Sequence, residues 1–348
     1  MKTRVCRLHG RNDIRVETEE VPPPGSGEVL VRIGAGGICG SDLHYYQDGG
    51  FGPIRVREPI ILGHEVAGTV AALGAGVSTL AVGDRVALNP SRPCGRCRYC
   101  AEGLPIHCLS MRFFGSALRF PHEQGAFRDL IVVDALQCEP VGPNVSLGEA
   151  ACAEPLAVCL HALSRAPDLS GKAVLVTGAG PIGALCVALA ARAGAAEIVV
   201  TDLQDATLAV AARMGATRTI NVGRDGEALE AYFADKGHFD VVFECSAAAP
   251  ALRAAIAATR PTGTIVQVGV AGDLPVPVNM LVGKEIALVG THRFAGEYAE
   301  AVRAISSGAI DVSPIITARF DVTDALAAFA EAGDRSRAVK VQLTFADA

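Results

Sequence analysis

The sequence predicts an α/β protein of two domains, the first rich in β-strands and the second built on a doubly wound parallel sheet. A chain of 348 residues has room for two domains, and 50% of its residues are hydrophobic, enough for two sizeable cores. From about residue 150, short apolar strands alternate with alanine-rich helices, a pattern typical of a parallel sheet covered by helices. We place one domain at residues 1–148, completed by 290–348, and the other at 149–289.

Short runs of β-branched residues, separated by glycine, proline and aspartate, predict strands throughout the first part of the chain. The clearest of these runs are Val29–Ile33, Ala67–Val70 and Asp84–Leu88. A further strand is expected near the C-terminus, at Val339–Thr344. Because strands and helices no longer alternate before this last strand, we expect the end of the chain to return to the first domain.

The second part of the chain predicts a parallel sheet with helices on both faces. The expected strands are Val174–Thr177, Glu197–Thr201, Thr219–Val222, Phe239–Glu244, Thr264–Val268 and Ile286–Val289. The expected helices are Ile182–Ala193, Leu203–Met214, Gly226–Ala234 and Ala248–Thr259, with one more near Gly296–Ser307. The strands are apolar on both faces, as a buried parallel sheet requires.

The charge of the chain argues against several classes of partner. A formal net charge of −6 at pH 7 does not favour nucleic acid or an anionic membrane surface. The uncharged stretch 173–191 is broken by the turn Gly178–Pro181, so we expect no membrane-spanning helix. Met1–Asp13 lacks the apolar run of a signal peptide, and 11 cysteines without such a signal indicate a reducing compartment. We therefore expect a cytoplasmic protein that acts on a small molecule.

A glycine-rich turn between a predicted strand and a predicted helix indicates a dinucleotide site. It has the pattern G-x-G-x-x-G, in which Gly178, Gly180 and Gly183 are the glycines and Pro181 and Ile182 precede the last one. Such glycines let the backbone approach a pyrophosphate, and the N-terminus of the following helix supplies donors to it. The sequence therefore predicts cofactor binding at this turn.

The residue at the end of the next strand indicates which cofactor binds. Asp202 lies 19 residues after Gly183 (202 − 183), where a carboxylate suits the ribose hydroxyls of NAD and repels the 2′-phosphate of NADP. The following residues, Leu203–Asp205, offer no arginine for such a phosphate. We therefore expect NAD. Asp202 can also cap the next helix, and the two roles are compatible.

Four closely spaced cysteines predict a structural zinc site. Cys94, Cys97, Cys100 and Cys108 lie in a loop rich in glycine, arginine and proline. Four thiolates fill the tetrahedral shell of Zn²⁺ and leave no position open for a substrate. An iron–sulfur cluster is the competing interpretation, but nothing else in the sequence indicates electron transfer.

A second constellation predicts a zinc ion with an open position. Cys39, His64, Glu65 and Glu154 offer one sulfur, one nitrogen and two carboxylates from three separate places in the chain. Three protein ligands and one open position are typical of catalytic zinc. Each residue alone has a simpler explanation, as a packed cysteine, a hydrogen-bonding histidine or a carboxylate at a helix start. Their presence together with a cofactor motif favours the catalytic site.

Two polar residues beside Cys39 predict a route for a proton. An open zinc position can act as a Lewis acid on an alcohol oxygen, and the alcohol proton must then leave a dry pocket. On a helical turn, Ser41 would lie beside the reacting oxygen and His44 nearer to solvent. We expect these two residues to form a proton relay.

Together these residues resemble the zinc-containing medium-chain dehydrogenase/reductase family over essentially the whole chain. The resemblance implies a GroES-like catalytic domain, a Rossmann domain with the active site between them, and a homotetramer or a dimer. Within the family the chain is similar to the polyol dehydrogenases, because Ala153–Leu156 carries Glu154 where simple alcohol dehydrogenases have a cysteine. In that branch either Glu65 or Glu154 binds zinc directly while the other acts through water, and the sequence leaves this choice open.

Further stretches are similar to members of this branch that act on sugar acids: Gly36–Gln47, Phe113–Ala117 with Phe120–His122, Gly283–Glu285 and Arg337–Leu343. By this similarity Tyr45, Phe114 and Arg293 line the substrate pocket. The resemblance therefore implies a polyhydroxylated substrate, either a sugar acid or a neutral polyol.

A sugar acid needs a cation for its carboxylate, and four residues are candidates. We expect Arg57 and His122 to be solvated at the surface. For Arg119 a surface role and a substrate contact are both open, and we expect Arg119 or Arg293 to select the acid over the neutral polyol.

We therefore expect an enzyme that transfers hydride from a secondary alcohol of a sugar acid or polyol to NAD. One alternative is a dehydrogenase of neutral polyols such as sorbitol or xylitol. A non-catalytic dinucleotide-binding protein with only the structural metal is the alternative from another class. Zinc-free quinone reduction would need neither metal site. Two zinc ions per chain would favour the enzyme, whereas one would favour the non-catalytic protein.

Overall fold

The computed structural model describes residues 1–270 and 272–345, which form two compact units. The first unit contains Met1–Glu154, Tyr298–Asp334 and the described residues from Lys340 onward. The second contains Pro155–Glu297 and Arg335–Val339. The domain limits expected from the sequence stay a prediction, and residues 346–348 of the expected first domain lie outside the described residues.

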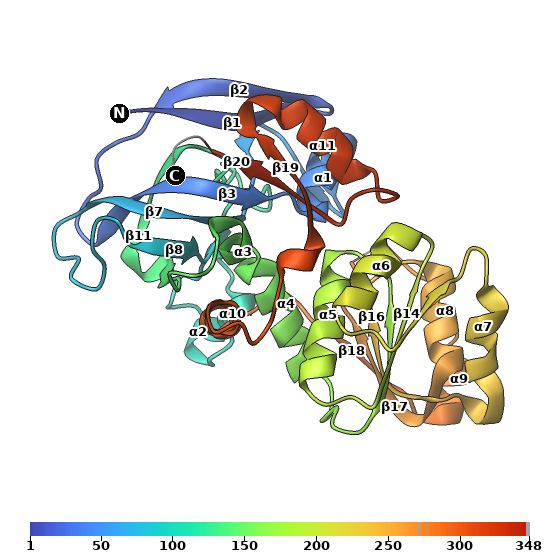
Figure 1. The fold of residues 1–348 in the computed structure, drawn as a ribbon. Coiled ribbons are helices and arrows are strands. Elements are labelled where there is room, and N and C mark those ends of the chain that lie inside the picture. Colours follow the sequence, from blue (N-terminus) through green and yellow to red (C-terminus); the bar gives the residue numbers. More distant parts are fainter. Residues whose placement is uncertain (271, 346–348) are drawn as a thin grey trace. The chain divides into compact units, whose positions relative to one another are not determined.

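A seven-stranded sheet forms the centre of the first unit, in the order β12-β8-β7-β3-β20-β19 with β11 paired to β3. Its strands are β3 (Glu28–Gly37), β7 (Glu65–Leu73), β8 (Arg85–Leu88), β11 (Leu130–Asp134), β12 (Cys138–Pro140), β19 (Ile316–Asp321) and β20 (Lys340–Thr344). Strand β20 is antiparallel to β3, with Gln342 opposite Gly37. The end of the chain therefore returns to the first sheet, as the sequence indicated (Figure 1).

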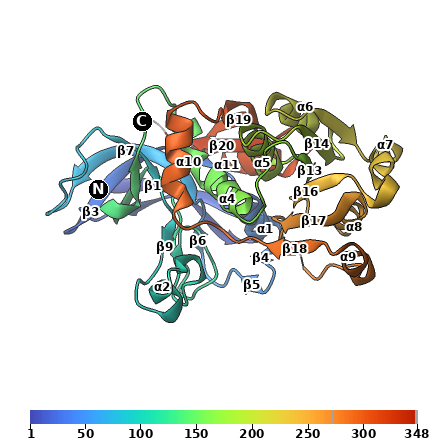
Figure 2. The same cartoon turned by 90° about the horizontal axis from the view of Figure 1, so that it is seen from below.

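Shorter elements surround this sheet. Strands β1 (Lys2–Gly10), β2 (Asp13–Glu20) and β6 (Ile60–Ile61) form a three-stranded sheet, whereas β4 (Gly50–Phe51) pairs with β5 (Ile54–Arg55) and β9 (Ser91–Arg92) with β10 (Arg112–Phe113). The helices are α1 (Gly40–Asp48), α2 (Arg98–Ala101), α3 (Leu147–Ala151), α10 (Glu297–Ser306) and α11 (Ala325–Gly333). Figure 2 shows the long strands β3 and β7 side by side, and the short helix α2 lies in the loop between β9 and β10.

The second unit is a six-stranded sheet in the order β15-β14-β13-β16-β17-β18, with every pair parallel. Its strands are β13 (Ala173–Thr177), β14 (Glu197–Asp202), β15 (Arg218–Asn221), β16 (Phe239–Glu244), β17 (Thr259–Gln267) and β18 (Ala287–Gly290). This order reverses direction beside β13, which is the arrangement of the Rossmann fold. The predicted doubly wound sheet is confirmed.

Helices cover both faces of this sheet. Helices α5 (Pro181–Arg192) and α6 (Asp205–Arg213) lie along one face and α8 (Ala249–Ala258) along the other (Figure 1). The two faces follow from the topology, because right-handed crossovers that run in opposite directions along a sheet place their helices on opposite sides. Helix α5 begins with Pro181, whose missing N–H costs nothing at a first helical position.

The sequence missed several elements that depend on tertiary contacts. Helices α4 (Ala153–Ser164) and α9 (Val278–Lys284) were not expected, nor were α11 and β19. The predicted helix Gly226–Ala234 is shorter, because α7 (Gly226–Glu230) passes into a 3₁₀ turn, Ala231–Lys236. Helix α4 is buried on nearly all sides, so it lacks the apolar and polar faces that reveal a surface helix. Among the described residues, no helix is both long enough and apolar enough to cross a membrane.

Candidate functional site

Three of the predicted ligands of the catalytic zinc lie together in the first unit. One ligand atom each from Cys39, His64 and Glu65 lies within 4.8 Å of the other two. Cys39 precedes the first residue of α1, whereas Glu65 begins β7 and His64 stands immediately before it. The sulfur, nitrogen and carboxylate oxygen come from buried or half-buried residues, and this donor set fits Zn²⁺.

Glu154 lies close to these three residues but outside the group that their ligand atoms form. It is 5% exposed, and burial raises the pKa of its carboxyl to about 8, with the charges of Glu65 and Cys39 acting in the same direction. Burial, followed by the charge of Glu65, likewise raises the pKa of the Cys39 thiol to about 11. A buried site with this many acidic groups requires a cation to ionise fully, which is a second indication that the residues suit a metal.

Asp42 contacts two of the candidate ligands, and the sequence analysis missed it. Its side chain is fully buried and accepts a hydrogen bond from the backbone N–H of Cys39 at 3.0 Å. Its other oxygen lies 3.4 Å from the N–H of Gly63 and 3.7 Å from Nδ1 of His64. Asp42 therefore orients two candidate ligands, and its place as a short acidic residue in the first turn of a helix was the signal for it.

Lys340 is the second residue that the sequence analysis missed. Its ammonium group lies 2.8 Å and 2.7 Å from the two carboxylate oxygens of Glu65, and both residues are almost fully buried. Burial acts to lower the pKa of Lys340, but the negative charge of Glu65 outweighs it and the net shift is upward. The signal was a single lysine within the apolar strand Val339–Thr344, because buried charges are seldom left unpaired.

The two predicted relay residues follow Cys39 on α1. The Ser41 hydroxyl acts to lower the pKa of the Cys39 thiol, against the larger effect of burial. His44 lies nearer to solvent, with 44% of its side chain exposed and Nδ1 3.0 Å from Oδ2 of Asp48. The half-exposed imidazole of His44 agrees with the solvent end of the predicted relay, whose function stays a prediction.

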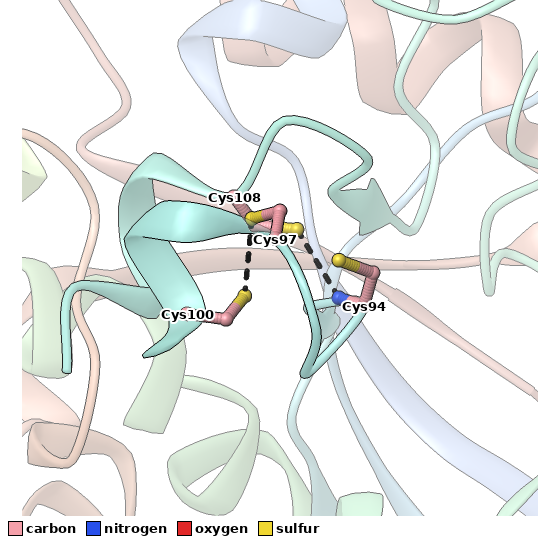
Figure 3. Close-up of side chains that lie close together, drawn as sticks. All are labelled: Cys94, Cys97, Cys100 and Cys108. Atoms are coloured by element: carbon pink, nitrogen blue, oxygen red, sulfur yellow. Dashed lines mark hydrogen bonds between the residues drawn. The ribbon is translucent and has the colours of Figure 1, made fainter. Parts of the chain in front are cut away.

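The four cysteines of the predicted structural zinc site are gathered in one loop (Figure 3). Their sulfur atoms all lie within 4.8 Å of one another, and the backbone N–H groups of Cys94 and Ser110 donate to Sγ of Cys108 at 3.1 Å and 3.3 Å. Donors from the backbone of Cys100 and Leu109 lower the pKa of the Cys97 thiol to about 6.

The pKa of the neighbouring thiol, Cys100, shifts in the opposite direction. Burial and the nearby sulfur atoms raise the pKa of Cys100 to about 12, so the four groups ionise together only around a cation. The number of sulfur atoms and their close approach fit a tetrahedral zinc ion.

The glycine-rich turn of the second unit has the geometry that a dinucleotide needs. Gly178 has a φ of +86°. A Cβ at Gly183 would lie 1.8 Å from the carbonyl oxygen of Gly178, so the turn tolerates no side chain at Gly183. A Cβ at Gly180 would meet nothing within 4 Å, which leaves the backbone there open to a ligand. Pro181 and Ile182 then begin α5, whose N-terminus faces this turn.

Asp202 connects the strand β14 to this turn. Its Oδ2 accepts a hydrogen bond from the N–H of Ala179 at 2.6 Å, and its Oδ1 accepts from Leu203 and Gln204 at 2.7 Å and 2.9 Å. The expectation that Asp202 caps the next helix is wrong, because α6 begins at Asp205 after Gln204 and these bonds go to residues that precede the helix. The ribose contact stays a prediction. The fold also brings Arg224 to within 3.0 Å of Asp205, so a cation that the local sequence did not reveal lies near the end of β14.

The predicted substrate residues are in both units. In the first unit Tyr45 and Phe114 are buried, and the Tyr45 hydroxyl accepts a hydrogen bond from the N–H of Ala117 at 3.3 Å. Arg119 is exposed and donates to the carbonyl oxygen of Ser110 at 3.0 Å. Arg293 belongs to the second unit and has a φ of 51°. Contact of these residues with a substrate stays a prediction.

The expectation that His122 is solvated at the surface is wrong. The residue is 6% exposed, its Nε2 accepts a hydrogen bond from the N–H of Arg57 at 2.9 Å, and its Nδ1 donates to the carbonyl oxygen of Arg119 at 2.7 Å. The imidazole therefore satisfies two backbone groups of a loop instead of meeting water. Arg57 is exposed, as expected, and its guanidinium lies 4.7 Å from the centre of the Phe120 ring.

Comparison with known families matches both parts of the chain. Residues 25–143 match the alcohol dehydrogenase GroES-like domain, and residues 181–307 match the zinc-binding dehydrogenase domain. Together the two matches cover more than half of the chain.

Individual relatives match over nearly the whole length. The L-idonate 5-dehydrogenase (NAD(P)(+)) of Escherichia coli (strain K12) is 42% identical over 346 residues, which is 99% of both proteins. The sorbitol dehydrogenase of Bacillus subtilis (strain 168) is 37% identical over 90% of this chain and 89% of its own. The crystal structure of L-idonate 5-dehydrogenase from Escherichia coli K-12 MG1655 superposes with a TM-score of 0.95, covering 99% of each chain at 41% identity.

Proposed function

The chain belongs to the zinc-binding alcohol dehydrogenases of the medium-chain dehydrogenase/reductase family, and on this premise we propose that it oxidises L-idonate to 5-keto-D-gluconate with NAD. The observation that carries the proposal is the 42% identity, over 99% of both proteins, to an L-idonate 5-dehydrogenase. The cluster of Cys39, His64 and Glu65 supplies the chemistry for oxidation of a secondary alcohol.

Each residue of the cluster has a role in this proposal. Cys39, His64 and Glu65 would hold the catalytic zinc, and Glu154 would act on it through water, because it lies outside the group of close ligand atoms. When bound, zinc polarises the alcohol oxygen and NAD accepts the hydride. Asp42 keeps Cys39 and His64 in place, and the buried surroundings exclude bulk water from the reacting groups.

The proton of the alcohol leaves along α1 in this proposal. The Ser41 hydroxyl receives it beside Cys39, and the half-exposed His44 passes it to solvent. The hydrogen bond between His44 and Asp48 fixes the imidazole where the helix meets water.

Initial-rate measurements with both cofactors test the proposed reaction. L-Idonate, D-gluconate, sorbitol, xylitol and L-threonine should each be offered with NAD and with NADP. We expect the highest kcat/KM for L-idonate with NAD. Activity on neutral polyols alone would overturn the choice of substrate and favour the second candidate, a neutral polyol dehydrogenase, which the 37% identity to a sorbitol dehydrogenase supports.

A count of zinc per chain tests the proposal against the non-catalytic alternative. Two ions favour the enzyme, because both cysteine-containing groups would then be filled. One ion would favour a dinucleotide-binding protein with only its structural metal. Quinone reduction without zinc would need neither group of ligands, so the presence of both groups argues against it.

Selection of the acid is expected to depend on an arginine. Replacing the arginine that binds the substrate carboxylate should lower the preference for idonate over sorbitol, measured as a ratio of kcat/KM values, by roughly tenfold to a hundredfold, because a charge-assisted hydrogen bond is lost. The variants to compare are Arg119→Ala and Arg293→Ala. Arg57→Ala is the matched control, since its guanidinium is exposed and stacks on Phe120. An unchanged preference in both test variants would contradict the idea.

Cofactor choice is expected to depend on two charges near the end of β14. Asp202→Asn keeps an acceptor oxygen for the backbone but removes the charge that repels a 2′-phosphate, so the NAD/NADP ratio of kcat/KM should fall by about tenfold or more. Arg224→Ala should lower activity with NADP and spare activity with NAD, because Arg224 is the nearby cation. Asp205→Asn serves as the control for the loss of a neighbouring acid. A constant ratio in Asp202→Asn would refute the assignment.

We propose that the chain assembles as a homotetramer or a dimer and resides in the cytoplasm. Strand β18 is an edge strand of the parallel sheet, and an edge strand can pair with the same strand of a second copy. Leu288 of β18 and Val278 and Val282 of α9 are exposed apolar residues that such a contact could cover. The described cysteines are all free, which suits a reducing compartment. Sedimentation equilibrium decides the state of assembly, and a monomer at micromolar concentration would contradict the proposal.

A further inference from the structure

The ammonium group of Lys340 is committed to the carboxylate of one candidate zinc ligand. It has three donors and three acceptors: Oε1 of Glu65 at 2.8 Å, Oε2 of Glu65 at 2.7 Å and the carbonyl oxygen of Ile38 at 3.1 Å. The residue is 2% exposed, so water does not compete for these bonds. The charge of Lys340 therefore acts on Glu65 and not on solvent.

The backbone fixes both partners of this pair. Lys340 begins β20, which is held to the end of β3 by a hydrogen bond from the N–H of Ile38 to the carbonyl oxygen of Val341 at 2.9 Å. Glu65 begins β7 opposite Gly37 of β3, and a Cβ at Gly37 would lie 2.2 Å from Oε2 of Glu65. The carboxylate therefore lies over a glycine and against an ammonium group, with little freedom to turn elsewhere.

The charges of the site show what this ammonium group can do. Ionised Cys39, Glu65 and Glu154 together carry three negative charges, one more than Zn²⁺ neutralises, and the buried Asp42 beside His64 adds a further acidic group. Lys340 supplies one positive charge that offsets part of this negative charge, and it does so at the carboxylate of Glu65. A surplus negative charge in a buried site would oppose the ionisation of a substrate hydroxyl, because charges interact strongly where water is excluded.

We propose that Lys340 is a positioning residue that tunes the catalytic metal through Glu65. By donating to both oxygens of Glu65, it weakens this carboxylate as a metal ligand and offsets its charge, which preserves the Lewis acidity that alcohol oxidation needs. The effect is opposite to that of a carboxylate behind a histidine ligand, which strengthens the donor. The inference rests on the proposed dehydrogenase function for its kinetic consequence, but its consequence for metal binding is independent of the substrate.

The variant Lys340→Met tests the proposal because it keeps the length of the side chain and removes its charge. We expect the rise of kcat/KM with pH to shift by about one unit to higher pH, so that activity near neutral pH falls about tenfold. We also expect slower release of the catalytic zinc to a chelator, because Glu65 becomes a stronger ligand. Lys340→Arg keeps the charge and should retain the wild-type pH profile.

Two outcomes would overturn the proposal. If Lys340→Met lowers thermal stability but leaves both the pH profile and zinc release unchanged, Lys340 is only a structural partner of Glu65. If zinc is released faster from Lys340→Met, the ammonium group strengthens metal binding instead of weakening it. Zinc release is measured without substrate, so failure to find an active substrate would defeat the proposed function and leave this test intact.

A second variant covers the case in which the single variant does not fold, since a buried carboxylate without its partner is costly. The double variant Lys340→Met with Glu65→Gln removes one positive and one negative charge, so the total charge of the filled site is unchanged. It should hold zinc more weakly than the wild type and keep the wild-type pH profile. A profile displaced by a unit or more in this double variant would show that the balance of charge is not what Lys340 provides.

Discussion

Replacing His64 with alanine is expected to leave one zinc ion per chain and to lower kcat by about three orders of magnitude. The estimate follows from the several kcal/mol that a metal supplies as a Lewis acid, since each 1.36 kcal/mol corresponds to about a factor of ten in rate. The loss should be specific to the catalytic metal, because His64 lies with Cys39 and Glu65 and not with the four clustered cysteines. Metal analysis and steady-state kinetics on the same preparation measure both effects.

A matched control separates loss of the ligand from loss of a histidine. His9 is partly buried and lies 2.7 Å from Glu17, away from both groups of candidate ligands. His9→Ala should therefore keep two zinc ions and the wild-type kcat. If His64→Ala retains two zinc ions and full activity, the catalytic metal is not held where we place it.

The elements that the sequence predicted well are those whose signal is local. The strand at Val174–Thr177, the glycine-rich turn and α5 follow one another without interruption, so one stretch of sequence contains the complete pattern. The four cysteines of the loop are equally local, because they fall between residues 94 and 108. In each case the residues that predict the structure or the site lie within one short stretch of the chain.

The parts that the sequence analysis missed depend on contacts between distant residues. Lys340 and Glu65 are 275 positions apart and meet only because β20 and β7 both pair with β3. The approach of Arg224 to Asp205 similarly depends on the pairing of β15 with β14, across 19 positions. Neither spacing has a periodic signature, so a charged residue inside an apolar run was the only trace of the first pair.

One aromatic residue connects the two predicted metal sites of the first unit. Phe113 ends the short strand β10 and belongs to the buried cluster formed by Cys108 and Met111, against which the other three cysteines pack. Its ring also lies 5.5 Å from the imidazole of His64. Order in the cysteine loop therefore supports the position of a catalytic ligand, which gives the structural zinc an influence on activity.

Replacing Cys97 with serine is expected to remove the structural zinc and to loosen this loop. The cluster around it is small, so the metal supplies much of the stability of the loop. We expect a loss of about 2–4 kcal/mol, seen as a fall of roughly 5–10 °C in the apparent Tm. Because Phe113 then packs less firmly against His64, kcat/KM should fall about tenfold, well short of the loss in His64→Ala.

Trypsin provides the sharpest readout, because the loop carries its own cleavage sites. Arg96 and Arg98 are exposed on either side of Cys97, and cleavage after them requires the loop to open locally. Cys97→Ser should be cut there much faster than the wild type, and removal of zinc by a chelator should have the same effect. Cys138→Ala, which removes a buried thiol outside both metal groups, is the control and should keep two zinc ions and a resistant loop. Equal cleavage rates in Cys97→Ser and the wild type would mean that the loop is ordered by its packing and not by a metal.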